Sequence, residues 1–595
     1  MALRLYWRSS RRHVSLLVLC TVLGALLSVA ITLGTGLLVG SVPGTVRDGL
    51  GSAAGLRLQA ALAVTAAAFA ARLALAPLQA LVVAGLTERV GQAVDRRLIE
   101  WCSAPDGIAH LESPATADRI LLALGSGSIP AAATVASLVT LVSARLAAVG
   151  AALILVTFAW WCPIVIALCS VVQHRWTMRE LDLAYRQFYR SMPELRRAGY
   201  YRDLAMGPVA AKEVRLLGLA DWTVGRFVDL WRGAMQSVWD ERRRLRKYAL
   251  LTLLVAALGY GLVLGAICLA AFRGEISLTA LVIYGQAGLG MMGLAVIGDP
   301  EMTWRLGGKT LAHAAAFETP DSEPVGPAAH ATYRPLTGPI TFERVTFSYP
   351  GVEDEVLDGL DLTIPEGRTT ALVGANGAGK TTLVKLLARL YEPCAGVISV
   401  GGTDIGQLPV DHWRAQLAII FQDFVRYELS CRDNVAFGDL ERGGEWTPLD
   451  RAAEDAGARD LIERLPGGWG TTLAAAYEGG VDLSGGEWQR VALARALLAA
   501  QRPGAIVVLD EPTASLDVRA EAELFDRLID ATRGRTTILI SHRFSSVRRA
   551  DLIVVIDRGR VAEQGTHDEL VRGNGLYQQL YSLQVERFEQ PRVTT

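Results

Sequence analysis

The chain is poor in charge and in cysteine. Only 20% of its 595 residues are charged, and 59 basic side chains against 60 acidic ones leave a formal net charge of −1. Without a basic excess, the composition excludes a protein that binds nucleic acid through a strongly positive surface. Seven cysteines in a chain of this length cannot form the disulfide scaffold of a small secreted protein. A hydrophobic content of 51% also excludes a disordered chain, which leaves a large soluble enzyme or a membrane protein.

Long apolar runs decide between these two classes. No charged residue occurs between Arg12 and Arg47, an interval that exceeds the ~20 residues needed to cross a hydrocarbon core. Further runs follow at residues 58–84, 130–150, 152–173, 248–272 and 276–298. The block 130–173 is about twice the length of one span, so we expect a turn near Gly150. The sequence therefore predicts an all-α transmembrane domain of six helices before residue 300.

Two of the predicted spans contain a charged residue, Arg72 in the second and Arg145 in the third. Charged side chains inside a membrane are rare and usually functional. A guanidinium can also reach the membrane surface along its own flexible stem, which would make both residues structural. The sequence leaves both interpretations of Arg72 and Arg145 open.

The start of the chain has a second interpretation. Ser10-Arg11-Arg12 before an apolar run is similar to a twin-arginine export signal. The run is far longer than the ~7–15 residues of a signal-peptide core, and no clear Ala-x-Ala cleavage site ends it. We therefore expect a membrane-spanning helix that the arginines anchor, and not a cleaved signal.

The distribution of Lys and Arg predicts the orientation of the helices. Residues 173–247 hold sixteen of them, whereas the loop 43–57 has only Arg47 and Arg57 and the last short loop only Arg273. Because cytoplasmic loops are enriched in Lys and Arg, both termini are predicted to be cytoplasmic in a multi-pass protein of the cell membrane. The excess of Arg over Lys is typical of a bacterium with a GC-rich genome.

The rest of the chain divides by composition. The segments 85–129 and 173–247 are too long for simple connectors, so we expect the membrane helices to continue into the cytosol. Four prolines between residues 319 and 338 mark a linker. The predicted parts are a transmembrane domain at 1–318, a linker at 319–338, a cytosolic domain at 339–583 and a tail at 584–595.

A phosphate-binding loop defines the chemistry of the cytosolic domain. Residues 369–373 predict a buried strand, and the apolar spacing of residues 383–390 predicts a helix. Between them lies Gly374-Ala375-Asn376-Gly377-Ala378-Gly379-Lys380-Thr381, which has the pattern G-x-x-x-x-G-K-T. The glycines allow backbone N–H groups to close around a phosphate at the positive end of the helix. Lys380 would bridge the β- and γ-phosphates, and the Thr381 hydroxyl would ligate Mg²⁺.

An acidic pair completes this predicted site. The apolar run 505–509 predicts a buried parallel strand, and Asp510-Glu511 ends it. Asp510 would hold the shell of the Mg²⁺ ion, and Glu511 would polarise a water for attack on the γ-phosphate. The sequence thus predicts an α/β P-loop NTPase domain that uses ATP and Mg²⁺.

A glycine-rich pentapeptide lies between these two elements. In Leu483-Ser484-Gly485-Gly486-Glu487, a Ser-Gly-Gly turn opens a helix and presents a hydroxyl and free N–H groups to an anion. With this pentapeptide the chain resembles the ATP-binding cassette (ABC) transporter family, whose signature it matches.

The resemblance implies roles for further residues. Tyr349 would stack on adenine, and Gln422 would contact Mg²⁺ and the attacking water. His542 would contact the γ-phosphate, and Asp517 would lie in a loop that faces the partner cassette. The segment Glu478-Gly479-Gly480 would couple the cassette to the membrane helices.

These roles form three overlapping sets. The implied catalytic residues are Glu511, His542 and Gln422. The implied Mg²⁺ ligands are Thr381, Gln422 and Asp510. The implied ATP-binding residues are Tyr349, Gly374, Asn376, Gly377, Gly379, Lys380, Thr381, Thr382, Ser484, Gly485, Gly486, Asp510 and Asp517.

Six helices followed by one cassette resemble an exporter-type half-transporter. Two cassettes would pair head to tail, with each ATP between the phosphate loop of one and the signature of the other. The implied partner is a second half-transporter, in a homodimer or a heterodimer. ATP hydrolysis would drive alternating access and export of a hydrophobic or amphipathic compound such as a drug, a lipid or a peptide. Trp488 departs from the family, which more often has a polar residue there, and we expect it to touch the surface of the signature helix rather than the nucleotide.

Two alternatives use the same fold. The first is an ATP-gated channel or regulator, which need not keep every hydrolytic residue, whereas this sequence keeps them all. The second is an importer, for example of an iron chelate, for which the direction of transport is the deciding observation.

Overall fold

The computed structural model describes residues 2–125, 129–208, 210–295, 298–317, 335–512 and 518–589. Contacts divide the chain into two compact units. One unit contains residues 1–102 and 115–320, and the other contains residues 103–114 and 321–595. Most of the predicted linker 319–338 and the end of the predicted tail lie outside the described residues.

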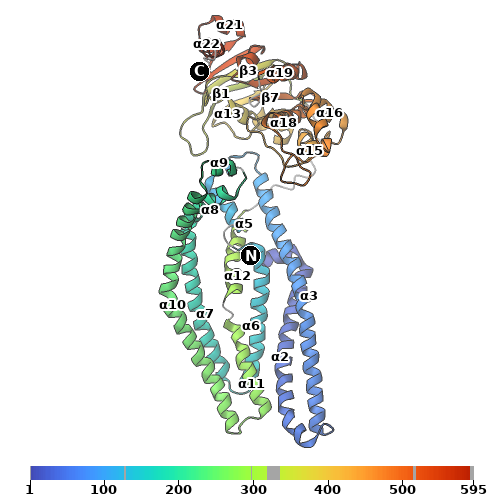
Figure 1. Ribbon diagram of the computed structural model, residues 1–595, viewed down its shortest axis with the longest axis vertical. Coiled ribbons are helices and arrows are strands. Elements are labelled where there is room, and N and C mark those ends of the chain that lie inside the picture. Colours follow the sequence, from blue (N-terminus) through green and yellow to red (C-terminus); the bar gives the residue numbers. More distant parts are fainter. Residues whose placement is uncertain are drawn as a thin grey trace. The chain divides into compact units, whose positions relative to one another are not determined.

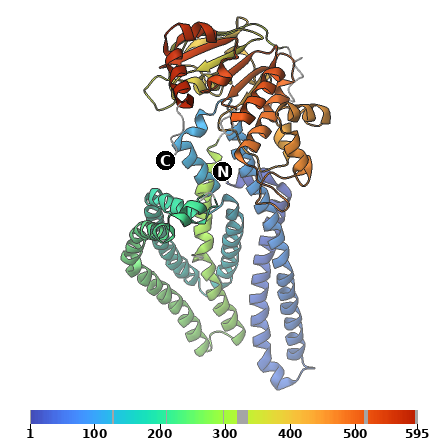
Figure 2. The same ribbon diagram turned by 45° about the horizontal axis from the view of Figure 1, so that its top comes forward.

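The first unit is entirely helical in its described part. The helix α6 packs against α2, α11 and α12, and α10 packs against α7 and α8. Both views show α2 and α3 running side by side (Figure 1, Figure 2). The helices are α1 (Ala2–Ser9), α2 (Arg11–Asp48), α3 (Ala53–Ser103), α5 (Pro114–Leu124), α6 (Thr134–Val156), α7 (Trp161–Arg190), α8 (Met192–Met206), α9 (Ala211–Leu216), α10 (Ala220–Phe272), α11 (Leu278–Gly290) and α12 (Asp299–Ala315), with 3-10 turns at Ala131–Ala133 and Met291–Ala295.

Several of these helices are long and apolar enough to cross a membrane. Among the described residues, five segments meet this condition by length and composition. The helices α3 and α10 have 51 and 53 residues and continue well past their apolar runs, as the long connecting segments predicted. The five segments are Arg11–Asp48, Ala53–Ser103, Ala131–Val156, Leu250–Phe272 and Leu278–Ala315.

The predicted turn near Gly150 is wrong. Helix α6 continues through Gly150 to Val156, and the chain turns at residues 157–160 instead. A Cβ atom at Gly150 would lie 2.5 Å from Val29 Cγ2 of α2, so this glycine allows two helices to approach closely. The apolar run predicted as the fourth span is therefore divided between the end of α6 and the start of α7. Because α7 contains only the second part of this apolar run, it is not among the segments that are long and apolar enough to cross a membrane.

Charged groups connect three helices of this unit. Glu301 of α12 is 5% exposed, and its carboxylate lies 3.1 Å from Arg145 of α6 and 3.6 Å from Arg305. Arg305 also lies 3.4 Å from Asp182 of α7. A buried carboxylate is tolerated only when it is paired, so Arg145 neutralises Glu301. This contact favours the structural interpretation of Arg145.

The second unit combines two sheets with helices. Strands β2, β1, β4 and β5 form an antiparallel sheet in that order, and the six-stranded sheet has the order β10-β9-β3-β8-β7-β6. In the six-stranded sheet all pairs are parallel except β10 with β9. The strands are β1 (Ile340–Phe347), β2 (Leu357–Ile364), β3 (Thr369–Val373), β4 (Ala395–Val400), β5 (Thr403–Asp404), β6 (Leu417–Ile420), β7 (Ile506–Asp510), β8 (Thr537–Ile540), β9 (Leu552–Asp557) and β10 (Arg560–Gly565).

Helices complete three hydrophobic cores around these strands, as far as the structure describes them. One core joins the antiparallel sheet, α13 and one face of the six-stranded sheet, and a second joins β6 and β7 to α15, α16 and α18. The third joins β3 and β9 to α20, α21 and α22. The helices are α4 (Ala109–Glu112), α13 (Lys380–Leu387), α14 (Val410–Arg414), α15 (Cys431–Ala436), α16 (Trp446–Asp455), α17 (Arg459–Arg464), α18 (Gly485–Ala500), α19 (Val518–Thr532), α20 (Phe544–Val547), α21 (His567–Arg572) and α22 (Leu576–Glu589), with 3-10 turns at Ile405–Gln407 and Gly468–Gly470.

A short segment from the first part of the chain belongs to this second unit. Residues 103–114, which contain α4, group with the cassette strands by contacts. The Ile108 N–H donates to Leu390 O over 3.0 Å, and Arg414 donates to Asp106 O. A Cβ atom at Gly107 would lie 3.0 Å from Leu390 O, so the two backbones approach closely there. The sequence placed this segment within a cytoplasmic extension of the membrane helices and contained no signal for its docking.

Candidate functional site

The loop between β3 and α13 has a backbone that its glycines make possible. Gly377 and Gly379 have φ angles of +83° and +101°, in the left-handed region that favours glycine. A Cβ atom at Gly379 would lie 2.6 Å from Leu357 Cδ2, and one at Gly374 would lie 2.2 Å from Ile556 O. The loop therefore curves tightly, and α13 begins directly after it at Lys380. This geometry suits the binding of a phosphate at the N-terminus of a helix.

Lys380 lies over this loop. Its Nζ atom donates to Gly374 O over 2.8 Å and to Ala375 O over 2.9 Å. Burial lowers the pKa of Lys380, while the carboxylates of Glu511 and Asp510 act in the opposite direction. An anionic phosphate would strengthen the charged form further, because it adds an opposite charge beside a partly desolvated ammonium.

Asp510 ends the buried strand β7 and is 1% exposed. Burial raises the pKa of Asp510 to about 6, although the hydrogen bond from the Thr381 hydroxyl to Oδ2, over 3.0 Å, opposes this shift. The other carboxylate oxygen, Oδ1, is buried and has no hydrogen-bond partner in the described part of the chain. Such an atom carries a desolvation cost unless a donor or a cation reaches it. Carboxylate and hydroxyl oxygens are ligands that Mg²⁺ prefers, so the residues present fit a magnesium ion.

Glu511 is held between two predicted catalytic residues. Gln422 Nε2 donates to its Oε2 atom over 3.0 Å, and His542 Nδ1 lies 3.1 Å from its Oε1 atom. The backbone of Glu511 has a φ angle of +49°, which is uncommon for a residue with a side chain and is frequent at functional sites. Gln489 of the signature helix α18 also donates to Glu511 O over 3.3 Å. Three predicted catalytic residues from separate parts of the sequence thus meet at one carboxylate.

An aromatic wall lies beside the phosphate loop. The Tyr349 hydroxyl lies 3.0 Å from Thr382 Oγ1, and its ring meets the rings of Phe347 and Tyr391 edge to face, at centroid distances of 5.1 and 5.3 Å. Lys385 Nζ lies 5.3 Å from the centroid of the Tyr349 ring. These contacts fix the ring at one side of the site, where a flat base could pack against it.

These groups line one cavity of about 730 Å³. Most of the predicted site residues border it, and Gly374 supports it through the contact with Lys380. Val356 and Ile540 border it as well, and the sequence analysis missed them because their apolar pattern is that of any core strand. The lining residues are Tyr349, Val356, Asn376, Gly377, Gly379, Lys380, Thr381, Thr382, Gln422, Asp510, Glu511, Ile540 and His542.

The predicted signature residues do not join this cavity. Ser484 is exposed and precedes α18, where Glu487 accepts hydrogen bonds from the Ser484 N–H over 2.9 Å and from its hydroxyl over 2.8 Å. Ser484, Gly485 and Gly486 are absent from the cavity lining. Trp488 is 2% exposed, packs in the core beside α16 and is absent from the cavity lining. Asp517 lies outside the described residues.

Known proteins resemble both the cassette and the whole chain. Residues 357–514 match the family model of the ABC transporters. Residues 357–514 are therefore an ABC transporter domain. Over 96% of its length it also superposes on 98% of a solved chain, a bacterial Atm1-family ABC exporter with ATP bound, with a TM-score of 0.74 and 25% sequence identity. The predicted architecture of helical membrane domain plus α/β ABC cassette is confirmed.

Curated relatives resemble the ABC cassette half of the chain. An ATP-dependent lipid A-core flippase from Alkalilimnicola ehrlichii is 42% identical over 270 residues, which are 45% of this chain and 45% of that protein. The ABC multidrug transporter atrD from Emericella nidulans is 43% identical over 250 residues, which are 42% of this chain and 18% of that protein. In both cases the match spans less than half the length of the relative.

Replacing Glu511 with Gln tests the role of the carboxylate in the ABC cassette. Glutamine keeps the size of the side chain but cannot accept a proton, so we expect ATP hydrolysis by the purified full-length protein to fall by about 10²-fold or more. Binding of ATP, measured by equilibrium binding of a radiolabelled nucleotide, should persist. Glu366→Gln, which changes an exposed carboxylate outside the cavity, is the matched control and should hydrolyse ATP at the wild-type rate. Undiminished hydrolysis in Glu511→Gln would contradict the assignment.

Proposed function

We propose that this ABC transporter is an ATP-driven exporter of a hydrophobic or amphipathic compound. The observation that carries the proposal is the convergence of Gln422 and His542 on Glu511 in a cassette that follows a set of membrane-length helices. The flippase and the multidrug transporter among its relatives, and its fold likeness to an exporter, favour export over the importer and channel alternatives. Both termini and the cassette would be cytoplasmic, in the cell membrane of a bacterium.

Each residue of the cavity would have a distinct task in ATP hydrolysis. The loop N–H groups and Lys380 would hold the β- and γ-phosphates, and Tyr349 would pack on the adenine. Glu511, oriented by its contacts with Gln422 and His542, would accept the proton of the attacking water. Thr381, Gln422 and Asp510 would hold Mg²⁺, which neutralises phosphate charge when bound.

A second half-transporter would complete the site. The signature residues Ser484 to Gly486 lie outside the cavity of their own cassette, and Ser484 is exposed. A hydroxyl and N–H groups at the start of a helix form an anion site, which a γ-phosphate from another cassette would fill. The proposal therefore requires a dimer, either of two identical chains or with a related chain. ATP would drive a conformational change only if it bound the closed dimer more tightly than the open one.

A chain of contacts would transmit the effect of nucleotide binding from the cavity to the segment 103–114. Tyr349 of the cavity packs edge to face on Tyr391, and the Tyr391 hydroxyl donates to the Glu112 carboxylate. Burial, and to a smaller extent Glu112, raises the pKa of Tyr391, so its hydroxyl stays protonated as a donor. Because the chain on both sides of residues 103–114 belongs to the helical unit, movement of this segment would pull on the membrane helices.

Replacing Tyr391 with Phe tests this connection. The rings stay in contact while the hydroxyl bond to Glu112 is lost. We expect the KM for ATP to change by less than about twofold, because Tyr349 and the cavity remain intact. Hydrogen exchange across residues 103–114 would be measured on the full-length protein in lipid nanodiscs, with and without ATP. We expect the ATP-induced change to fall by at least about half, because this hydrogen bond connects the cavity with the segment.

Tyr477→Phe removes a hydroxyl from an exposed tyrosine and serves as the control, for which we expect wild-type exchange. If Tyr391→Phe kept the full ATP-induced change, the proposed route would be wrong.

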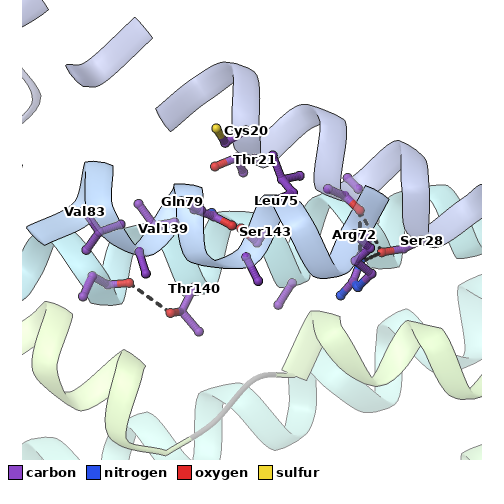
Figure 3. A pocket seen from close by; sticks show the side chains of 17 residues that line it. Cys20, Thr21, Ser28, Arg72, Leu75, Gln79, Val83, Val139, Thr140 and Ser143 are labelled. Carbon is purple, nitrogen blue, oxygen red and sulfur yellow. Dashed lines mark hydrogen bonds between the residues drawn. The ribbon is translucent and has the colours of Figure 1, made fainter. Parts of the chain in front are cut away.

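A cavity among the membrane helices is the candidate site for the transported compound. It has a volume of about 520 Å³ and lies between α2, α3 and α6 (Figure 3). Arg72 donates to Gly24 O over 3.1 Å and to the Ser28 hydroxyl, and Gln79 and Ser143 add further polar groups to a mainly apolar lining. No carboxylate is among the lining residues, so the positive charge of Arg72 favours an amphipathic compound with an acidic group.

Replacing Arg72 with Gln tests this preference. We expect taurocholate, an acidic amphiphile, to stimulate ATP hydrolysis in the wild type more than the lipophilic cation tetraphenylphosphonium. In Arg72→Gln the taurocholate concentration for half-maximal stimulation should rise about tenfold, because a charge-assisted hydrogen bond is lost. Arg145→Gln, which removes an arginine outside this cavity, should not show the same selective loss for the acidic amphiphile. Equal stimulation by both probes would contradict the proposed preference.

A further inference from the structure

A second arginine-bordered cavity lies in the helical unit, apart from the cavity of Arg72. It has a volume of about 420 Å³ and lies between α1, α3 and α12. It shares no residue with the Arg72 cavity or with the nucleotide site. Its lining residues are Arg4, Leu5, Arg8, Ala93, Val94, Arg97, Leu311, Ala314 and Ala315. We call it the α1 cavity.

The polar side of the α1 cavity carries only positive charge. Arg4 and Arg8 lie four residues apart on α1, so they face the same way, and both are exposed. In the described part of the chain, no salt bridge involves either of them. The lining contains no Asp or Glu. Two guanidiniums with no acidic partner, beside a third, make a site for an anion.

The third arginine is fixed in place. Arg97 Nε donates to Phe317 O over 2.6 Å, and its Nη2 atom donates to Ala315 O over 3.2 Å. These carbonyls lie at the C-terminal end of α12, where a cation is electrostatically favoured. Arg97 thus joins α3 to α12 and leaves its Nη1 group outside both of these bonds. One of the three guanidiniums is therefore preorganised before any anion arrives.

The opposite side of the α1 cavity is apolar. Val94, Leu311 and Ala314 are 7%, 4% and 2% exposed and belong to one hydrophobic cluster, against which Leu5 packs. A site for a free inorganic anion needs no such wall. Guanidiniums on one side and hydrocarbon on the other match a molecule that has a phosphate joined to an acyl chain.

The position of α1 agrees with such a ligand. Helix α1 directly precedes α2, whose uncharged run begins after Arg12. Tyr6 of α1 is buried at 3% exposure and donates or accepts a hydrogen bond with Thr134 over 2.6 Å, whereas the adjacent Trp7 is 46% exposed. Short helices with basic residues and an exposed Trp lie at the level of lipid headgroups. Arg97 lies in the segment 85–129 that is predicted to extend into the cytosol, so the α1 cavity would open on the cytoplasmic side, next to the layer of anionic headgroups.

We propose that the α1 cavity binds the headgroup phosphate of an anionic phospholipid, with Arg4, Arg8 and Arg97 as its ligands. The bound lipid joins α1 to α3 and α12, because each of these helices contributes one wall. This site is separate from the transported compound and from ATP. A membrane that lacks anionic lipid would leave α1 without this connection.

The test compares variants of the full-length protein in lipid nanodiscs. Native mass spectrometry would measure binding of phosphatidylglycerol against a phosphatidylcholine background. In the double variant Arg4→Gln/Arg8→Gln we expect an approximately thirtyfold loss of affinity for phosphatidylglycerol, because two positive charges that attract the anionic headgroup are removed. The Arg47→Gln/Arg57→Gln control removes the same charge from the loop 43–57 and should bind like the wild type. ATP hydrolysis in pure phosphatidylcholine should be equal in all three proteins, which shows that they are folded.

Three results would overturn the proposal. Unchanged phosphatidylglycerol binding in Arg4→Gln/Arg8→Gln would mean that the α1 cavity is not the site. An equal loss in the control variant would mean that only net charge matters. Full displacement of the lipid by inorganic phosphate at equal concentration would mean that the site recognises a free anion and that the apolar wall contributes nothing.

Discussion

The buried end of strand β7 is the constraint on which the proposed nucleotide site depends. All five residues of β7 are buried between β6 and β8, so the chain can place Asp510 and Glu511 only where the strand leaves the sheet. Asp510 consequently loses solvent, and one of its oxygens has no partner among the residues that the structure describes, while Glu511 adopts a φ angle of +49° and turns its carboxylate towards Gln422 and His542. Because β3, β8 and β7 pair in parallel, their C-terminal ends lie at the same edge of the sheet. The phosphate loop and the two acidic residues lie at these ends, and they therefore meet.

Burial also supports the proposed connection between the nucleotide cavity and the segment 103–114. Tyr391 is 5% exposed and lies between the ring of Tyr349 and the carboxylate of Glu112. Packed rings and a hydrogen bond from a buried donor do not deform continuously, so a change at one end alters the contacts at the other. The chain continues into the helical unit on both sides of the segment 103–114, whereas the rest of the second unit begins only after residue 320. Coupling of ATP to transport would therefore act through side chains that the phosphate-loop and signature patterns do not include.

Charge in the helical unit has three different uses, and its composition could not distinguish them. Arg145 neutralises the buried Glu301 and connects two helices. Arg72 borders a mixed cavity without a carboxylate partner in its lining, and Arg4, Arg8 and Arg97 border another. In each case the groups that face the arginines lie on another helix, at a sequence separation that no local pattern indicates. The near-zero net charge of the chain thus conceals local groups of arginines whose function depends on what faces them.

The sequence by itself determined the membrane-length helices, the P-loop cassette and nearly every residue that borders the nucleotide cavity. It could do so because apolar run length, strand alternation and the glycines of a phosphate loop are local requirements of the backbone. Tertiary structure alone decided the role of Gly150, which allows α2 and α6 to approach and does not form a turn, and the burial of Trp488. It alone also decided that residues 103–114 dock on the cassette and that Tyr391 contacts Glu112. These features depend on which surfaces meet across tens to hundreds of residues, and a contact of that kind leaves no periodic pattern in the sequence.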